Sequence, residues 1–154
     1  MPAAFSWLTL KDLLVPYSQS EYLTVLTHAP ADVVKALAEA VLPELGEIKV
    51  LINRTGLIML PYTDSAEGVV FHLGEVLVSE AHVEIRGGAQ GYAVCAGRDL
   101  VQALAVALLD AALTAGIQSA RIHAFLDTQA REQAQADDLL LRKVEATRVE
   151  METF

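Results

Sequence analysis

Residues 74–86, GEVLVSEAHVEIR, alternate between apolar and polar side chains, and this alternation decides the fold. Successive side chains of an extended chain point to opposite faces, so Leu77, Ala81, Val83 and Ile85 share one face. The charged residues and the histidine between them share the other. A strand with one apolar and one polar face is typical of an antiparallel sheet that is covered on one side.

The segments around this strand carry a similar alternation and are separated by residues that favour turns. These separators are Thr55-Gly56, the loop 64–68, Gly74 and Gly87-Gly88. The connections are too short for the crossovers that parallel strands need. The sequence therefore predicts a mostly antiparallel sheet of about five strands. These strands would span about residues 48–52, 57–62, 69–73, 77–86 and 91–96.

Two N-terminal helices are expected before the sheet, where apolar residues recur at helical spacing. The first would cover Glu21–Thr27, and the second would start after Pro30 and stop before Pro43. The chain has no internal repeat and no low-complexity linker. We therefore expect an α+β fold in a single domain over residues 1–154, in which residues 1–20 form an irregular lead-in.

A helix that is apolar nearly all round is expected after the sheet. Asp99 can cap its first turn, with Gln102 three residues later as in a capping box, and Gly116 can end it. A helix without a polar face needs cover on more than one side. The sequence thus predicts a central packing helix.

The final helix, over about residues 118–148, has apolar ends and a polar middle. Ser119 can cap it, and residues 127–138 are almost entirely polar. One hypothesis is an arm that is domain-swapped or docks on a partner. The alternative is an amphipathic surface helix.

The composition points to an interface and excludes some partners. The chain is 53% hydrophobic with a mean hydropathy of +0.37, so it either has a subunit interface or has a core rich in Ala and Leu. Its net charge is −9, with 11 basic and 20 acidic residues, so we expect no nucleic-acid partner. Neither of the common glycine-rich phosphate-binding motifs occurs, so we expect no cofactor of its own. An anionic substrate would need basic groups from a partner or a local cluster.

Cysteine and hydropathy patterns suggest a cytoplasmic protein. Cys95 is the only cysteine, so no internal disulfide can form. Lys11 and Asp12 interrupt the apolar start of the chain, which argues against a signal peptide. The longest apolar run, residues 100–116, is shorter than the ~20 residues that span a bilayer. We therefore expect no membrane partner. The four histidines lack metal-binding spacing, so we also expect no metal site.

Four residues are candidates for interface or substrate contacts. Arg98 and Asp99 lie at a strand-to-helix junction, where backbone N–H groups can hold an anion. The other reading is structural: Asp99 caps the helix and forms a salt bridge with Arg98. Arg54 and Glu75 lie beside the predicted turns at the ends of strands. None of these residues can be identified as a catalytic acid, base or nucleophile.

Five short blocks of the chain resemble the PhnG family of phosphonate metabolism proteins. RTGLIM at 54–59 is similar to the family's RTGLVM, and FHLGE at 71–75 to its F-x-LGE segment. GRD at 97–99 and the DA pair at 110–111 resemble blocks that follow in the family. The tail ATRVE at 146–150 resembles the start of its last block. The blocks keep their order and spacing over most of the chain.

The resemblance implies a subunit of the carbon–phosphorus lyase complex. Family members act with PhnH, PhnI and PhnL to form alpha-D-ribose 1-methylphosphonate 5-triphosphate from ATP and methylphosphonate, releasing adenine. They also assemble with the radical lyase PhnJ. ATP would then be a substrate of the complex. The chain would be a homodimer within the complex and would be inactive alone. The alternatives are a non-catalytic dimeric scaffold and a stand-alone small-molecule enzyme with a cleft around His72 and Cys95.

Overall fold

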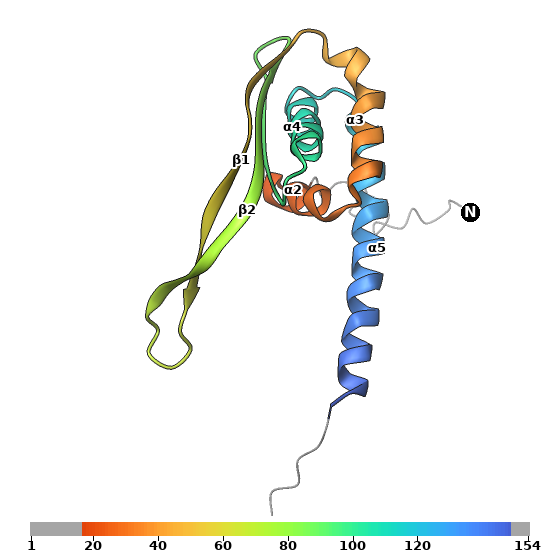
Figure 1. Cartoon of the computed structure of the whole chain (residues 1–154). Helices are drawn as coiled ribbons and strands as arrows, with labels where there is room; N and C mark the ends of the chain where they lie inside the picture. The colour runs from red at the N-terminus through yellow and green to blue at the C-terminus, as the bar shows by residue number, and fades with distance from the viewer. Residues whose placement is uncertain (1–16, 149–154) are drawn as a thin grey trace, which may run out of the picture.

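The computed structural model describes residues 17–148, which form four helices and three strands (Figure 1). Most of the predicted lead-in, residues 1–20, lies outside the described part. The elements are α2 (Gln19–His28), α3 (Ala31–Leu45), β1 (Ile48–Thr63), β2 (Val70–Ile85), β3 (Gln90–Ala96), α4 (Leu100–Thr114) and α5 (Ser119–Ala146). The α+β class predicted from the sequence is confirmed.

The predicted count of about five strands is wrong, because two expected turns are absent. Thr55-Gly56 lies inside β1 and Gly74 lies inside β2, so that each of these strands is 16 residues long. Neither Gly56 nor Gly74 has a positive φ. Both pair within the ladder, Gly56 with Val78 and Gly74 with Leu60. A glycine can continue an extended strand as well as end it, so its presence alone did not decide the matter.

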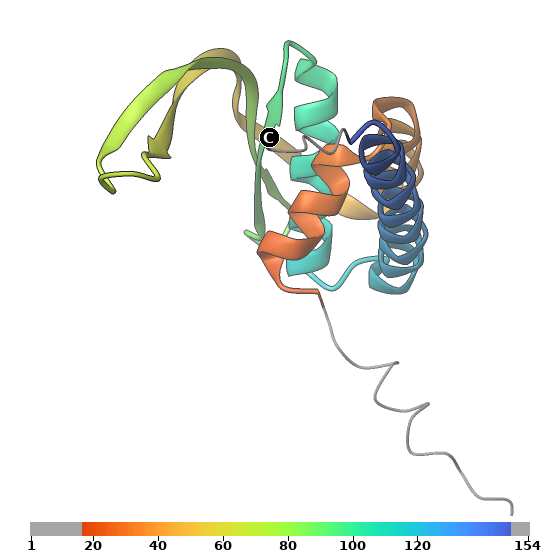
Figure 2. The ribbon, with the colours of Figure 1, turned by 90° about the horizontal axis from the view of Figure 1, so that it is seen from below.

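The three strands are antiparallel in the order β1-β2-β3, but β3 is much shorter than the other two. β1 and β2 pair from Ile48 opposite Ile85 to Thr63 opposite Val70. β3 covers β2 only from Val78 to Glu84. The outer half of the β1–β2 hairpin is therefore two-stranded and projects from the body (Figures 1 and 2). We call this outer half, residues 57–77, the hairpin arm.

The helices cover one face of the three-stranded part of the sheet. α4 packs on β2 and β3, and α3 packs on the opposite side of α4 (Figure 1). α2 contacts α4 and β3, and the first half of α5 packs against α2 and α4. The sequence-based expectation that the apolar helix needs cover on more than one side is confirmed.

The alternation in β2 sorts its inner half as predicted. Ala81, Val83 and Ile85 are buried against the helices, while His82 and Glu84 on the other face remain partly exposed. Leu77, which was expected on the buried face, is only half-buried because it lies just before the part of β2 that pairs with β3. Burial follows the periodicity only where a helix covers the strand.

The structure confirms one predicted helix boundary and corrects two. Asp99 caps α4 as predicted, since its side chain accepts a hydrogen bond from the Gln102 N–H at 2.9 Å. α3 does not stop before Pro43 but continues to Leu45, whose buried side chain holds the last turn. The predicted cap by Ser119 is wrong: the cap position of α5 is Gln118, which has a φ of 52° and makes no capping side-chain bond.

A close approach between β3 and α4 requires a glycine at position 91. A Cβ there would lie 1.9 Å from the backbone oxygen of Ala107 and 2.5 Å from the nitrogen of Ala111. No such contact is possible without moving the helix away from the sheet. Gly91 thus fixes the spacing of the two layers.

We expect Gly91→Ala to lower the free energy of unfolding by about 2 kcal/mol or more, because overpacking displaces α4. Urea denaturation followed by circular dichroism measures this loss. Gly74→Ala is the matched control, since a Cβ at Gly74 meets no atom within 4 Å and its φ is not positive. Equal stability of the two variants would show that Gly91 does not set the spacing between β3 and α4.

Candidate partner-binding surface

The hairpin arm exposes large apolar side chains on both of its faces. Leu57 pairs with Leu77 on one face, and Ile58 pairs with Val76 on the other. Leu57 is 61% exposed. The exposed large apolar residues of the arm are Leu57, Ile58, Met59, Leu60, Tyr62, Val69, Val70, Phe71 and Leu73. An isolated two-stranded hairpin is marginal in water, so this arm needs cover.

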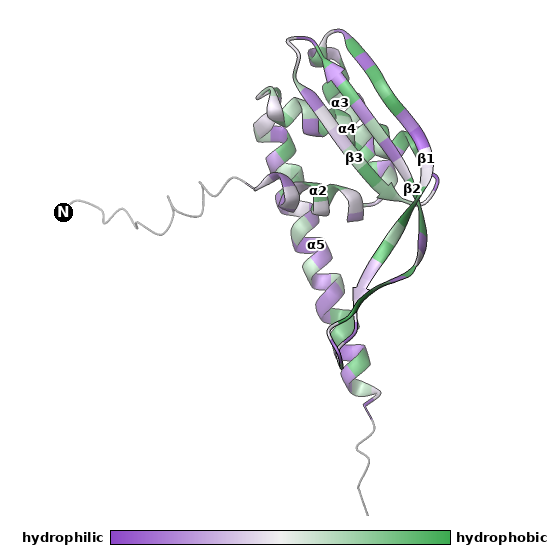
Figure 3. Ribbon diagram, turned by 90° about the vertical axis from the view of Figure 1, so that its left-hand side faces the viewer, coloured by the Kyte–Doolittle hydropathy of each residue, from purple (hydrophilic) through white to green (hydrophobic). Residues whose placement is uncertain are grey.

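The second half of α5 is a second uncovered arm. Ile122 and Leu126 in its first half are fully buried, and Leu140 and Val144 lie on the same face of the helix beyond a polar stretch. Those two outer side chains are 60% and 59% exposed. We call residues 134–146 the helix arm. Figure 3 shows the apolar positions along this end of the helix.

A polar network lies at the root of the hairpin arm, on the sheet face that the helices leave open. Arg54 Nε donates to Glu80 Oε2 at 2.7 Å, and Tyr92 Oη donates to Glu80 Oε1 at 2.8 Å. These bonds lower the pKa of Glu80, with the Arg54 contact as the largest cause, and raise the pKa of Tyr92. His82 lies edge-on to Tyr92, with ring centroids 6.0 Å apart. The network borders a hollow of about 370 Å³.

The four candidate residues do not converge on one point. Arg54 is tied to Glu80, and Glu75 lies farther out on the hairpin arm, opposite Met59. Arg98 and Asp99 follow β3 at the level where the hairpin arm begins, since Gly97 N donates to Leu77 O at 2.9 Å. Arg54, Arg98 and Asp99 are thus near the arm root, whereas Glu75 is on the arm itself.

The expected salt bridge between Arg98 and Asp99 is replaced by one from another helix. Lys35 of α3 lies 2.5 Å from Asp99 Oδ2, while Asp99 Oδ1 caps α4. The pKa of Asp99 is lowered, first by the Lys35 hydrogen bond and then by the Gln102 N–H. Among residues 17–148, Arg98 makes no ion pair and is exposed. Because Asp99 occupies the helix start, an anion there would have to displace it.

A buried carboxylate, Asp110, was not identified as a structural centre from the sequence. It accepts hydrogen bonds from Tyr22 Oη at 2.5 Å, from the Tyr92 N–H at 2.8 Å and from Gln19 Nε2 at 3.2 Å. The contacts join α2, α4 and β3. Burial and the bond to Asp110 raise the pKa of Tyr22. The sequence showed only a carboxylate within an apolar helix, at the DA pair, and its partners are 18 to 91 positions away.

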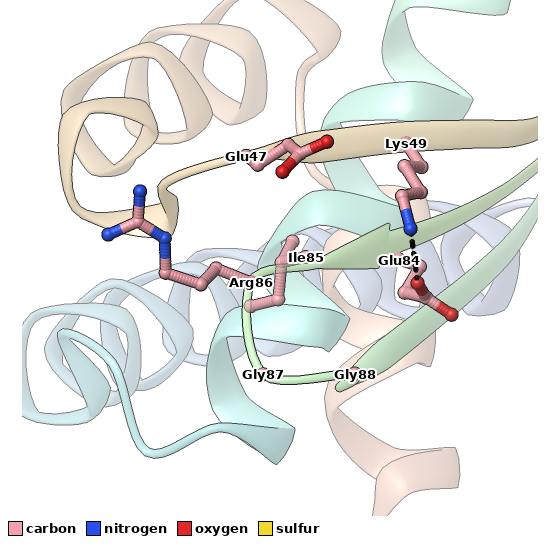
Figure 4. A pocket seen from close by; sticks show the side chains of 7 residues that line it. All are labelled: Glu47, Lys49, Glu84, Ile85, Arg86, Gly87 and Gly88. Atoms are coloured by element: carbon pink, nitrogen blue, oxygen red, sulfur yellow. Dashed lines mark hydrogen bonds and ion pairs between the residues drawn. The ribbon is translucent and has the colours of Figure 1, made fainter.

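A polar hollow next to the Gly87-Gly88 turn has a structural explanation (Figure 4). Lys49 on its rim is paired with Glu84 at 3.4 Å. Arg86 runs past Gly46, the residue that ends α3, where the helix dipole favours a cation. Of its two cations only Lys49 is paired, and Glu47 and Glu84 in the lining balance the two positive charges, which makes the hollow a poor anion site.

The cleft expected around His72 and Cys95 in the stand-alone enzyme alternative is not formed in the described chain. His72 pairs with Pro61 on the hairpin arm, whereas Cys95 pairs with Ser79 in the body. Burial raises the pKa of the Cys95 thiol to about 11, which disfavours the reactive thiolate. Within residues 17–148 there is also no group of three or more potential metal ligands and no helix able to cross a membrane.

An α+β body with two uncovered apolar arms defines a class of protein, namely a subunit that other chains complete. The sequence comparison gives the family. The family model described as phosphonate metabolism protein PhnG matches residues 18–154, so the chain belongs to the PhnG family. The search of curated proteins gave no match. The chain is accordingly a phosphonate metabolism subunit.

The Asp99–Lys35 contact gives a pH-dependent prediction. A carboxyl whose pKa is lowered in the folded state stabilises the fold above its unfolded value, ~3.9, and loses that contribution as the pH falls through the folded value. We expect Lys35→Met to cost about 1 kcal/mol or less at pH 7, since both groups are partly exposed. Urea titrations should show this difference shrinking as the pH falls below ~3.9 and Asp99 becomes protonated in the folded state. A difference that stays constant over the whole acid range would contradict the ion pair.

We expect Asp110→Asn to lower the free energy of unfolding by about 1–3 kcal/mol, because an amide N–H₂ must then face a buried donor. Asp127→Asn is the control, since Asp127 accepts its bond from Tyr17 at the surface. Thermal and urea unfolding of both variants give the comparison. If Asp110→Asn left the free energy of unfolding unchanged, the hydrogen bonds to Asp110 would not be what holds α2, α4 and β3 together.

Proposed function

We propose that the chain is a subunit of the carbon–phosphorus lyase complex and acts with PhnH, PhnI and PhnL. The reaction would join methylphosphonate to the ribose C1 of ATP and release adenine, giving alpha-D-ribose 1-methylphosphonate 5-triphosphate. A PhnJ-like subunit would assemble with it, in the cytoplasm. ATP enters as a substrate of the complex, and the chain is proposed to carry no cofactor of its own.

The observation that carries this proposal is the uncovered surface of the two arms. A free-standing enzyme of this size would bury such side chains in its own core, whereas a subunit buries them against its partners. The family membership of residues 18–154 gives the process in which those partners take part.

The charge distribution supports a shared site. ATP and methylphosphonate are anions, and the chain has a net charge of −9. At the arm root, the Arg54 guanidinium is already bound to Glu80 and the Lys35 ammonium to Asp99. Arg98 is the remaining candidate cation there. The proposal therefore assigns most of the phosphate binding to partner subunits.

Glu75 and Asp99 are proposed to act at the interface. Glu75 is exposed on the hairpin arm, where a basic group of another chain could reach it. Asp99 holds the start of α4, and through it the loop that presents Arg98. Neither residue is assigned an acid, base or nucleophile role.

The test is a reconstituted complex in which Arg98 or Arg54 is replaced by Gln. We expect Arg98→Gln to lower kcat/KM at least about tenfold if its charge contacts the substrate, because that corresponds to one charge-assisted hydrogen bond. Arg54→Gln should act less strongly, since Arg54 already has a partner. Arg121→Gln, an exposed arginine on the inner half of α5, is the control. Assembly is checked in parallel by size-exclusion chromatography.

The rival function is a scaffold that organises the other subunits without touching substrate. It is favoured by the ion pairs that Asp99 and Arg54 already make within the chain. Unchanged turnover in an intact complex carrying both Arg98→Gln and Arg54→Gln would support the scaffold. Full turnover by the isolated chain with ATP and methylphosphonate would reject both subunit proposals.

A further inference from the structure

Gly56 is a glycine inside a long strand, at a position where the backbone does not need one. Its φ is not positive, and a Cβ added there would meet no atom within 4 Å. It pairs with Val78 away from the register shifts of the ladder. A glycine inside a strand lowers stability, and such a glycine often marks a place that a ligand approaches closely. Gly56 lines the hollow of about 370 Å³ at the root of the hairpin arm.

Apolar side chains make up much of the lining of this hollow. They are Leu57, Ile58, Val78 and Val94. Val78 is only 5% exposed, although the sheet face on which it lies has no helix over it. The hairpin arm curls toward this face of the sheet (Figure 2). The volume of the hollow lies within the range of about 300–1,000 Å³ that small-molecule sites occupy.

The polar side of the hollow presents a hydrogen-bond donor beside an acceptor. Arg54 donates to Glu80 through Nε only, and its Nη groups make no hydrogen bond within residues 17–148. Each oxygen of the Glu80 carboxylate accepts one bond, from Arg54 or from Tyr92, and keeps a further lone pair. The lowered pKa of Glu80 keeps this carboxylate ionised at neutral pH. Tyr92 adds an aromatic ring that is 44% exposed.

The charges of the hollow select an uncharged ligand. Arg54 and Glu80 cancel each other, and the chain as a whole has a net charge of −9, so an oxyanion gains no net attraction there. A 6-aminopurine is uncharged and flat, and its faces can stack on an aromatic ring. One of its edges carries the N6–H₂ donor next to the N7 acceptor. This edge matches the acceptor and the donor that Glu80 and Arg54 present.

We propose that the hollow at Gly56 binds an adenine base. The amine of the base donates to Glu80, N7 accepts from Arg54, and the ring lies against Tyr92. A 6-oxopurine is disfavoured, because its O6 would face the Glu80 carboxylate. That the base is the one released from ATP rests on the function proposed above, whereas the binding of the base does not. The chain then holds the base of ATP while partner subunits hold the phosphates.

The first test titrates adenosine into the isotope-labelled full-length chain and follows the backbone amide signals by NMR. We expect a Kd of about 0.1–1 mM, as for other uncharged ligands of this size, with signal shifts concentrated at Thr55, Gly56 and Tyr92. Inosine has O6 in place of the amine and should bind at least about tenfold more weakly. No saturable binding of adenosine up to about 5 mM, or equal binding of inosine, would overturn the proposal.

Gly56→Val fills the hollow and should raise the Kd for adenosine at least about tenfold, because the side chain takes the place of the base. Valine favours strands, and a Cβ at this position meets no atom, so the fold should be kept. Gly74→Val is the matched control, since it alters another open strand glycine that does not line the hollow, and it should leave the Kd unchanged. Circular dichroism and thermal unfolding check both variants. An unchanged Kd in a folded Gly56→Val chain would reject the site.

Glu80→Gln tests the hydrogen-bond pattern without adding bulk. The amide N–H₂ of Gln can donate to the O6 of inosine, so the ratio of the inosine Kd to the adenosine Kd should fall from about tenfold or more toward one. A purely structural role of Glu80 would weaken the binding of both nucleosides equally. An unchanged ratio would therefore overturn the placement of the amine at Glu80, and the adenine site with it.

The reconstituted complex separates this inference from the proposed function. Gly56→Val should raise the KM for ATP at least about tenfold while the complex still assembles. Unchanged kcat and KM in a complex that requires this chain would reject the adenine site and leave the subunit role standing. Adenosine binding by the chain, together with no turnover by the complex, would reject the proposed function and support the site.

Discussion

The rest of the structure depends on a mismatch in strand length within the sheet. β1 and β2 are 16 residues each, whereas β3 is 7 residues long. Up to the row in which Gly56, Val78 and Ala96 pair, the strands have a third neighbour and a helical cover. Beyond that row the hairpin has neither. The boundary between body and arm, and therefore the place where Arg54 and Arg98 lie, is set by where β3 ends.

The body on the inner side of that boundary is complete by itself. Within residues 17–148, no buried side-chain polar atom lacks a hydrogen-bond partner. Asp110 gathers donors from α2 and β3, and Gly91 lets α4 come close enough for them to reach it. The same contacts explain how a carboxylate can be tolerated inside an apolar helix, because its oxygens accept hydrogen bonds from two other elements.

Unlike the body, the two arms leave their large apolar side chains uncovered. This contrast links the structure to the family assignment. The apolar side chains Ile122 and Leu126 of α5 are buried, whereas Leu140, on the same face beyond a polar stretch, has no cover. The hollow at the root of the hairpin arm is open, and its cation, Arg54, is matched by Glu80. A subunit of phosphonate metabolism with these properties has a large surface for association and little positive charge for an anionic substrate. Its contribution is therefore most readily understood through the chains that it contacts.

The sequence alone determined the features that depend on neighbours in the chain. These are the alternation of residues 74–86, the Gly87-Gly88 turn and the cap at Asp99. It also determined the α+β class and the family. The strand count, the Lys35 partner of Asp99 and the cluster around Asp110 depend on residues far apart in the chain, and only the tertiary structure decided them. Gly56 and Gly74 illustrate the reason. A glycine permits both a turn and an extended strand, and the choice between them is made by the strand that pairs with it.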